Sequence, residues 1–324
     1  MAKPPRHIPR DTSRRRMSVY IAVAAFFAVD ILLIVLALGC TQVGAESEAP
    51  QAIPTFDAVA STSAPTVTPS STPVAEAILP LPPTRLLGAV DEKTAWRAVT
   101  GDCPATPASP ELTTDGGATW KKTDATGPAK VTALQRLLVT SESVVEMVVL
   151  AKSDCAPQLV KTFVGGDTFK AYPDELDGAW FVDPADRATI HSPSGSAMAP
   201  CDAVVSLAVI NDKAAAALCA DGRLFATEDA AVTWSSPASI PGAVALTATD
   251  TGYLAAAVGR AECAGVQLLT LTPTLEATEF GCYKTDAQPA SLAGNVAVST
   301  AADTLWLWAV GAFVRSADGG ANWQ

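Results

Sequence analysis

The side chains that could carry covalent chemistry in this chain are few and scattered. A Ser-His-Asp triad needs a histidine as its base, and His191 is the one histidine outside the N-terminal tail. The Ser-, Pro- and Gly-rich segment from His191 to Ser196 predicts a flexible loop and a surface histidine. Asp183 and Asp186 could bind calcium, but we favour a solvated acidic loop. No glycine-rich phosphate loop is present. We predict no catalytic, cofactor-binding or metal-binding residue.

A recurring eight-residue motif carries more information than these side chains. Two clear copies span residues 113–120 and 316–323, and a weaker copy spans 227–234. The pattern is Ser/Thr-x-Asp-x-Gly-x-Thr/Asn-Trp, with Ala replacing Gly in the middle copy. Asp can accept N–H bonds from the residues after it, Gly takes a positive φ, and Trp begins the next strand, so the motif predicts a tight turn. Its positions are Thr113, Asp115, Gly117, Thr119, Trp120, Thr227, Asp229, Thr233, Trp234, Ser316, Asp318, Gly320, Asn322 and Trp323.

Two degenerate copies complete a regular spacing. Residues 161–169 keep the two glycines but have Val164 and Phe169 in place of Asp and Trp, and residues 272–280 keep Thr278 and Phe280. The Asp position recurs at intervals of about 40–50 residues, the period of a four-stranded propeller blade, except for one longer interval. We interpret residues 173–200 as an insertion within that interval. The spacing predicts an all-β propeller of about five four-stranded blades over residues 85–324.

The motif resembles the Asp-box, or BNR, repeat of sialidase-type propellers, the sortilin luminal domain and photosystem assembly factors of the Ycf48 type. The stretch from Trp308 to Gly320 is most similar to the Ycf48-type version. The resemblance covers residues 85–324. It implies a propeller in which the box is a structural turn at the blade periphery, and it implies no catalytic residue.

The same resemblance defines the alternative, an extracytoplasmic glycosidase. Sialidases use an arginine cluster, a Tyr/Glu nucleophile pair and an acid/base Asp. The tyrosines Tyr172, Tyr253 and Tyr283 have no matching context, the Arg-Ile-Pro signature is missing, and the arginines are scattered: Arg85, Arg97, Arg136, Arg187, Arg223, Arg260 and Arg315. Three convergent arginines, or two carboxylates about 5–10 Å apart at the ring's centre, would favour the enzyme. A flat mouth with exposed aromatic residues would favour a binding module.

Two interpretations remain for how the ring closes at its last blade. In the family the box Trp opens the outermost strand, but the sequence continues for one residue after Trp323. Residues 74–81 could supply the missing strand, although the neighbouring prolines make them a poor one. The other interpretation is an incomplete last blade.

The N-terminal part predicts a membrane-bound protein. Residues 17–39 are long and apolar enough to span a bilayer, and they follow the basic tail 1–16, which should stay in the cytoplasm. An uncleaved anchor, lipidation at Cys40 after cleavage, and ordinary cleavage near residues 43–45 are the three alternatives. Residues 40–84 are rich in Ala, Ser, Thr and Pro, which predicts a disordered stalk.

Each of these alternatives exports residues 85–324, where an even number of cysteines indicates disulfides. Their positions around the repeats predict sequential pairing of Cys103, Cys155, Cys201, Cys219, Cys263 and Cys282. Zinc is disfavoured because no CxxC exists. The net charge of −11 argues against a nucleic-acid partner. We expect a membrane-tethered, extracytoplasmic, non-catalytic propeller that binds a protein or glycan, with the glycosidase as the alternative.

Overall fold

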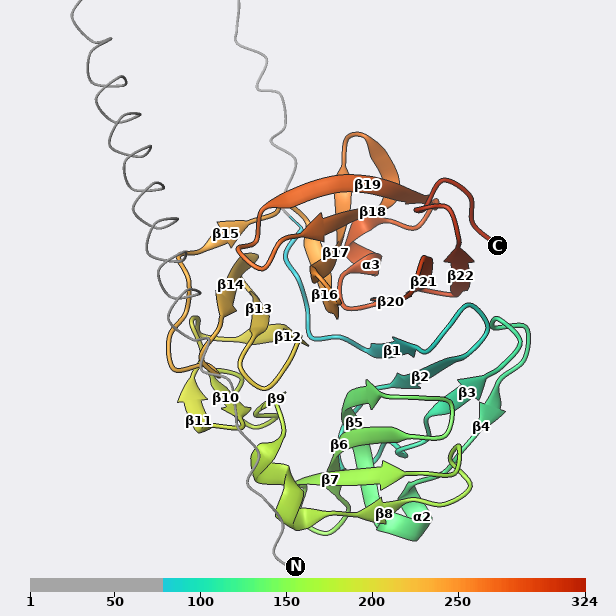
Figure 1. Cartoon of the computed structure of the whole chain (residues 1–324), viewed down its shortest axis with the longest axis vertical. Coiled ribbons are helices and arrows are strands. Elements are labelled where there is room, and N and C mark those ends of the chain that lie inside the picture. Colours follow the sequence, from blue (N-terminus) through green and yellow to red (C-terminus); the bar gives the residue numbers. More distant parts are fainter. Residues whose placement is uncertain (1–77) are drawn as a thin grey trace, which may run out of the picture. The chain divides into compact units, whose positions relative to one another are not determined.

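The computed structural model describes residues 78–324, and these form six antiparallel sheets around a centre (Figure 1). Blade 1 comprises β1 (Arg85–Ala89), β2 (Ala95–Val99), β3 (Glu111–Thr113) and β4 (Lys121–Lys122). Blade 2 comprises β5 (Val131–Val139), β6 (Val145–Ala151), β7 (Pro157–Thr162) and β8 (Lys170–Ala171). Blade 3 comprises β9 (Phe181–Val182), β10 (Thr189–Ser192) and β11 (Gly195–Met198).

The second half of the chain supplies the other three sheets. Blade 4 comprises β12 (Val204–Val209), β13 (Ala215–Cys219), β14 (Arg223–Thr227) and β15 (Ala238–Ser239). Blade 5 comprises β16 (Ala243–Thr249), β17 (Gly252–Arg260), β18 (Cys263–Leu271) and β19 (Ala277–Lys284), and blade 6 comprises β20 (Val296–Ala301), β21 (Thr304–Ala309) and β22 (Ala312–Ser316). The short helices are α2 (Thr126–Ala129), the 3-10 helix η1 (Pro173–Gly178) and α3 (Pro289–Leu292).

Strands follow one another in sequence order within every sheet, which is the arrangement of a β-propeller. The all-β propeller prediction is therefore confirmed, but the prediction of about five blades is wrong because six are present among residues 78–324. Four blades have four strands, and blades 3 and 6 have three.

The missed blade is the segment interpreted as an insertion. Residues 173–200 contain η1 and the whole of blade 3, at the lower left of Figure 1. The sequence pattern did not predict this blade, because its strands have two to four residues each and no box follows them. The long interval between repeats therefore holds a short blade without a box.

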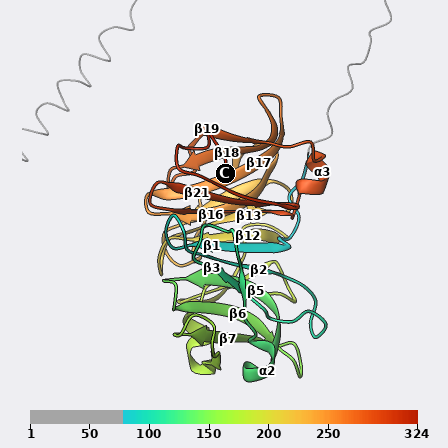
Figure 2. The ribbon, with the colours of Figure 1, turned by 90° about the vertical axis from the view of Figure 1, so that its right-hand side faces the viewer.

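The apolar cores lie between neighbouring blades. Side chains alternate across a strand, so one strand can serve two cores. On β17, Tyr253 and Ala255 join the core shared with blade 4, whereas Leu254 and Ala256 join the core shared with blade 6. Another core joins blades 1 and 2. Blade 5 is therefore buried on both faces by its neighbours, and Figure 2 shows the sheets of the ring from the side.

The ring closes between blades 6 and 1 through a tryptophan contact, and an equivalent contact joins blades 1 and 2. Trp96 on β2 is fully buried and donates its indole N–H to the carbonyl of Glu142 at 3.2 Å, in the β5–β6 turn. Trp306 on β21 is 1% exposed and donates in the same way to Asp91 at 3.1 Å, in the β1–β2 turn. The ring thus closes by packing the three-stranded sheet of blade 6 against the four-stranded sheet of blade 1.

The segment proposed to close the ring adds no strand within the described residues. Residues 78–84 run as coil; Ile78 packs against the core of blades 5 and 6, and the N–H of Thr84 bonds to the carbonyl of Gly294 at 2.7 Å. At the other end, Gln324 exchanges two backbone hydrogen bonds with Arg315 on β22. Among residues 78–324, blade 6 therefore has three strands, and Gln324 lies beside β22 where a fourth strand would pair.

Within residues 78–324, none of the helices has the length and apolar character needed to cross a bilayer. The predicted span 17–39, the tail 1–16, Cys40 and most of the stalk lie outside the described residues.

Candidate functional site: the central channel

The innermost strands of all six blades surround a cavity of about 770 Å³. Its wall comprises β1, β5, β9, β12, β16 and β20, which face the ring's centre in Figure 1. A volume of this size is typical of sites that bind a small molecule or a short segment of a larger ligand. We call this cavity the central channel.

Three of the scattered arginines meet the channel, and each bonds to the backbone of a neighbouring blade. Arg85 donates to the carbonyl of Asn295 at 2.8 Å. Arg136 donates to the carbonyl of Trp180. Arg187 donates to the carbonyls of Val204 and Val205 at 2.7 and 3.2 Å.

These carbonyls lie at equivalent places in three blades. Trp180 and Asn295 directly precede β9 and β20, and Val204 begins β12. Since the blades repeat one strand order around the ring, the starts of the inner strands gather at one end of the channel. We call this end, with its three arginines, the arginine mouth.

The arginine mouth carries partly desolvated positive charge. Burial lowers the pKa of Arg85 and of Arg187, and it lowers the pKa of Arg136 to about 10, so all three remain cationic at neutral pH. None of the ion pairs among residues 78–324 involves these arginines. A guanidinium has five N–H donors, and the contacts above use one or two of them. The remaining donors suit an anionic ligand.

Three arginines at the channel are the feature that we expected of the glycosidase, but the rest of the wall lacks the other groups of a sialidase. Among the described residues that line the channel there is one carboxylate, Asp102, and neither tyrosine nor glutamate. Glycoside hydrolysis generally uses two carboxyl groups. Sequence reasoning found the three arginines but not their convergence, because that depends on register and on the missed blade 3.

The box residues form turns away from this channel. In the first box, Asp115 accepts the Thr119 N–H at 2.9 Å and the Thr119 hydroxyl at 2.6 Å, and the Gly117 N–H bonds to the Thr113 hydroxyl at 2.9 Å. Gly117 has φ +89°. The same bonds occur around Asp229 and Asp318. None of the three box aspartates lines the channel.

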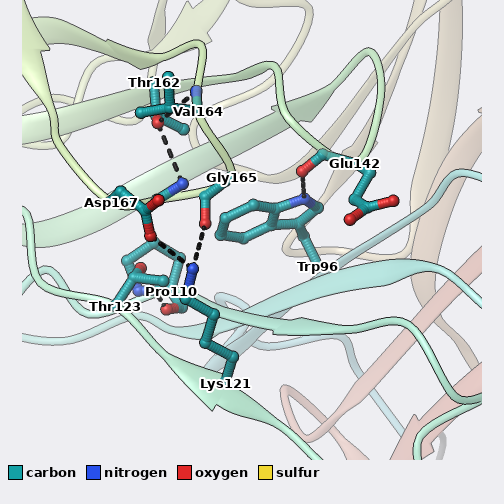
Figure 3. A network of polar contacts seen from close by, with 10 residues as sticks. Trp96, Pro110, Lys121, Thr123, Glu142, Thr162, Val164, Gly165 and Asp167 are labelled. Carbon is teal, nitrogen blue, oxygen red and sulfur yellow. Dashed lines mark hydrogen bonds and ion pairs between the residues drawn. The ribbon is translucent and has the colours of Figure 1, made fainter.

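The degenerate copies keep the hydroxyl bond without the aspartate. The N–H of Gly166 bonds to the Thr162 hydroxyl at 3.1 Å, and the N–H of Glu276 bonds to Thr272 at 3.0 Å. Figure 3 shows the Thr162 turn beside blade 1, where Lys121 pairs with Asp167 at 2.6 Å. In blade 5 the hydroxyl is that of Thr272, whereas Thr278 and Phe280 lie on β19. The motif in blade 5 therefore begins with the hydroxyl of Thr272, and the match based on Thr278 and Phe280 is wrong by one residue.

The box hydrogen bonds predict acid sensitivity. The side-chain and backbone bonds from Thr119, with the Thr113 hydroxyl, lower the pKa of Asp115 from 3.8 to about 2. A carboxyl whose pKa is lower in the folded state stabilises the fold above pH 3.8 and loses that contribution as the pH falls toward 2. We expect Asp115→Asn to flatten the pH dependence of the melting temperature between about pH 4 and 2. The control Asp250→Asn removes an exposed carboxyl outside the boxes; equal flattening there would contradict the assignment.

The cysteines form three disulfides, Cys103–Cys155, Cys201–Cys219 and Cys263–Cys282. This is the sequential pairing expected from their positions around the repeats. Cys103–Cys155 joins blades 1 and 2. Cys201–Cys219 links the segment before β12 to β13 of blade 4, and Cys263–Cys282 lies within blade 5.

His191 does not lie in a flexible loop. It sits on β10, within a hairpin whose turn is Pro193-Ser194, and it contacts both Asp183 and Ser196. The expectation failed because a two-residue turn with flanking Ser and Gly has the same composition as a longer loop. Among residues 78–324, no group of three His, Cys, Asp or Glu side chains is placed to hold a metal ion.

Comparison with known proteins adds no family assignment to the six-bladed β-propeller. The sequence matches no protein-family profile and, at a significant level, no curated protein. A structure of YCF48 bound to D1 peptide is similar over 77% of this chain and 81% of that one, with 15% identity and a TM-score of 0.37. YCF48 from Cyanidioschyzon merolae gives 16% identity and a TM-score of 0.38, covering 76% and 86% of the two chains.

A more distant similarity is to a GH74 xyloglucanase from Xanthomonas campestris. The identity is 18% and the TM-score 0.28, over 74% of this chain and 37% of that one. At these scores the similarities carry no argument about function, which has to come from the channel itself.

Proposed function

We propose that the propeller is a binding module whose channel is non-catalytic and whose arginine mouth receives an anionic group of an extracytoplasmic partner. The observation that carries this proposal is the convergence of three arginines on one cavity without a carboxylate bonded to any of them among residues 78–324. Partly buried guanidinium groups bind carboxylates strongly, because both partners are charged and the geometry can be bidentate. The ligand chemistry is therefore a carboxylate, from an acidic protein segment or an acidic glycan.

The bonds to neighbouring blades support binding rather than turnover. Each arginine is held in place by a backbone carbonyl before a ligand arrives, so little side-chain entropy is lost on binding. The single lining carboxylate, Asp102, leaves glycoside hydrolysis without its usual second carboxyl group.

The cellular setting extends the same proposal. We place the propeller outside the cytoplasm, tethered through residues 17–39 and a stalk up to residue 84, and we assign its repeats to the Asp-box type. Three disulfides support an oxidising compartment, since such bonds are rare in the cytosol.

Binding should depend on the arginines of the mouth. With solubilised full-length protein, we expect calorimetry to detect binding of a hexaglutamate peptide. The double variant Arg85→Gln/Arg187→Gln should weaken the affinity for this peptide roughly 10- to 100-fold. Arg223→Gln is the matched control, because Arg223 pairs with Asp221 at 2.7 Å and does not line the channel.

An oligogalacturonate of equal charge distinguishes the source of the carboxylate. Tighter binding of the peptide favours a protein partner, and tighter binding of the sugar favours a glycan. Cleavage of the sugar by wild type but not by Asp102→Asn would replace the binding proposal with the glycosidase. Failure of both anions to bind, or equal binding by the double variant, would reject the arginine mouth as the site.

A further inference from the structure

Blade 3 joins a serine, a histidine and an aspartate in one chain of hydrogen bonds. The hydroxyl of Ser196 lies 3.0 Å from Nδ1 of His191, and Nε2 of His191 lies 3.1 Å from an oxygen of Asp183. The imidazole thus has a hydroxyl on one side and a carboxylate on the other. This is the order of groups with which a histidine activates a serine and an acid orients the histidine, with the two ring nitrogens exchanged relative to serine proteases.

The strand register holds the serine and histidine together. In the β10–β11 hairpin His191 lies directly opposite Ser196, and in the β9–β10 pair it lies opposite Phe181. The imidazole stacks on the ring of Phe181, with 4.2 Å between ring centres and 6° between planes. Because Phe181 is 4% exposed, the imidazole rests on a fixed surface.

The aspartate is fixed by its own turn. One oxygen of Asp183 accepts the N–H groups of Ala185 and Asp186 at 2.8 and 3.1 Å, which leaves the other for His191. Burial raises the pKa of Asp183, but the hydrogen bonds from His191, Ala185 and Asp186 outweigh it and leave the pKa below its usual value. Asp183 is therefore a carboxylate at neutral pH and accepts the imidazole N–H.

A donor for a developing oxyanion lies beside the serine. β11 is the edge strand of blade 3, and the N–H of Ala199 bonds toward β10, to the carbonyl of Ala188. Since N–H directions alternate along an antiparallel strand, the N–H of Ser196 points away from β10, to the side of β11 where no strand pairs within residues 78–324. The backbone N–H of a nucleophilic serine is one of the donors that stabilise a tetrahedral intermediate.

We propose that Ser196 is a nucleophilic serine, activated by His191 and Asp183, that accepts the acyl group of small, exposed carboxylic esters. Its Oγ bonds to the ester carbonyl carbon as its proton passes to His191 Nδ1. The bond to the leaving alcohol then breaks, and that alcohol takes the proton. Water, deprotonated by His191, attacks the acyl-serine, releases the carboxylic acid and restores Ser196. Ser196 is exposed, so the site favours accessible esters over long acyl chains.

The residues of this activity differ from those of the arginine mouth. Ser196, His191 and Asp183 come from β11, β10 and the β9–β10 connection. None of them bonds to Arg85, Arg136 or Arg187, although Arg187 lies in the same connection as Asp183. Failure of anion binding therefore leaves the serine proposal standing, and failure of serine labelling leaves the arginine mouth standing.

Labelling with a fluorophosphonate tests the proposal on the full-length protein. We expect one adduct, placed at Ser196 by mass spectrometry and absent in Ser196→Ala. His191→Gln should slow labelling about 100-fold or more, the usual contribution of a general base. Asp183→Asn should slow it less, because Asn keeps the turn but loses the charge. The control Ser194→Ala changes an exposed serine of the same hairpin and should label at the wild-type rate.

The rates at which the same variants hydrolyse p-nitrophenyl acetate should follow the same order as their labelling rates. A folded wild-type protein, judged by circular dichroism, that takes no label would overturn the proposal. So would an adduct that persists in Ser196→Ala, or a labelling rate that His191→Gln leaves unchanged.

Discussion

Loss of the Cys103–Cys155 disulfide should lower the free energy of unfolding by about 4 kcal/mol, as the chain-entropy relation gives for a loop of this length. The two cysteines are 52 residues apart, the longest separation of the three pairs. The double variant Cys103→Ala/Cys155→Ala frees that loop in the unfolded state. Denaturant unfolding under oxidising conditions measures the change.

This bond also joins two blades, which makes its loss more damaging than loop length alone indicates. Cys103 lies between β2 and β3 of blade 1, and Cys155 lies in the β6–β7 turn of blade 2. The matched control is Cys263→Ala/Cys282→Ala, which opens a 19-residue separation between two strands that stay paired and costs about 3 kcal/mol by the same relation. A smaller loss for the Cys103–Cys155 pair than for this control would contradict the prediction.

Trp306→Ala is the second change with a large expected effect, a loss of about 3–5 kcal/mol. The indole of Trp306, on blade 6, is 1% exposed, and its N–H bonds to the carbonyl of Asp91, in blade 1, across the closure of the ring. Removing it leaves a cavity and breaks that bond. Thermal and denaturant unfolding measure the loss, and hydrogen exchange should show β1 and β20 opening before the other inner strands.

Two further variants separate the contributions. Trp306→Phe keeps most of the apolar volume but removes the indole N–H, so it should cost about 1 kcal/mol beyond the change in volume. Trp96→Ala removes the equivalent contact between blades 1 and 2 and should cost a similar amount to Trp306→Ala. If Trp306→Ala were nearly neutral while Trp96→Ala was severe, the ring would not depend on this contact for closure.

The sequence predicted those parts of the fold that depend on local chemistry. A hydroxyl, an aspartate and a glycine at fixed offsets form the same turn wherever they occur, so the turns at Asp115, Asp229 and Asp318 could be anticipated. The disulfide pairs could also be anticipated, because equivalent positions in repeated units lie at equivalent places in space.

Blade 3 and the candidate sites depend on contacts that no local pattern encodes. The strands of blade 3 are too short for an alternating pattern, and it has no box, so its residues suggested an insertion. Arg136 becomes part of a mouth because Trp180 of that blade lies beside it. His191 meets Ser196 only through the register of a two-residue hairpin, which composition does not distinguish from a loop.

The repeated tryptophan contact also bears on how far the blades of one ring can differ. In a propeller whose ring is closed by one strand shared between the two ends of the chain, closure depends on that strand. Here the contact between blades 6 and 1 is of the same kind as the contact between blades 1 and 2. In both, a tryptophan on the second strand of one blade donates its indole N–H to a turn of the next. The outer strands take no part in this contact, so blades with different numbers of strands can stand in one ring, as the three-stranded blade 3 does beside the four-stranded blades 2 and 4.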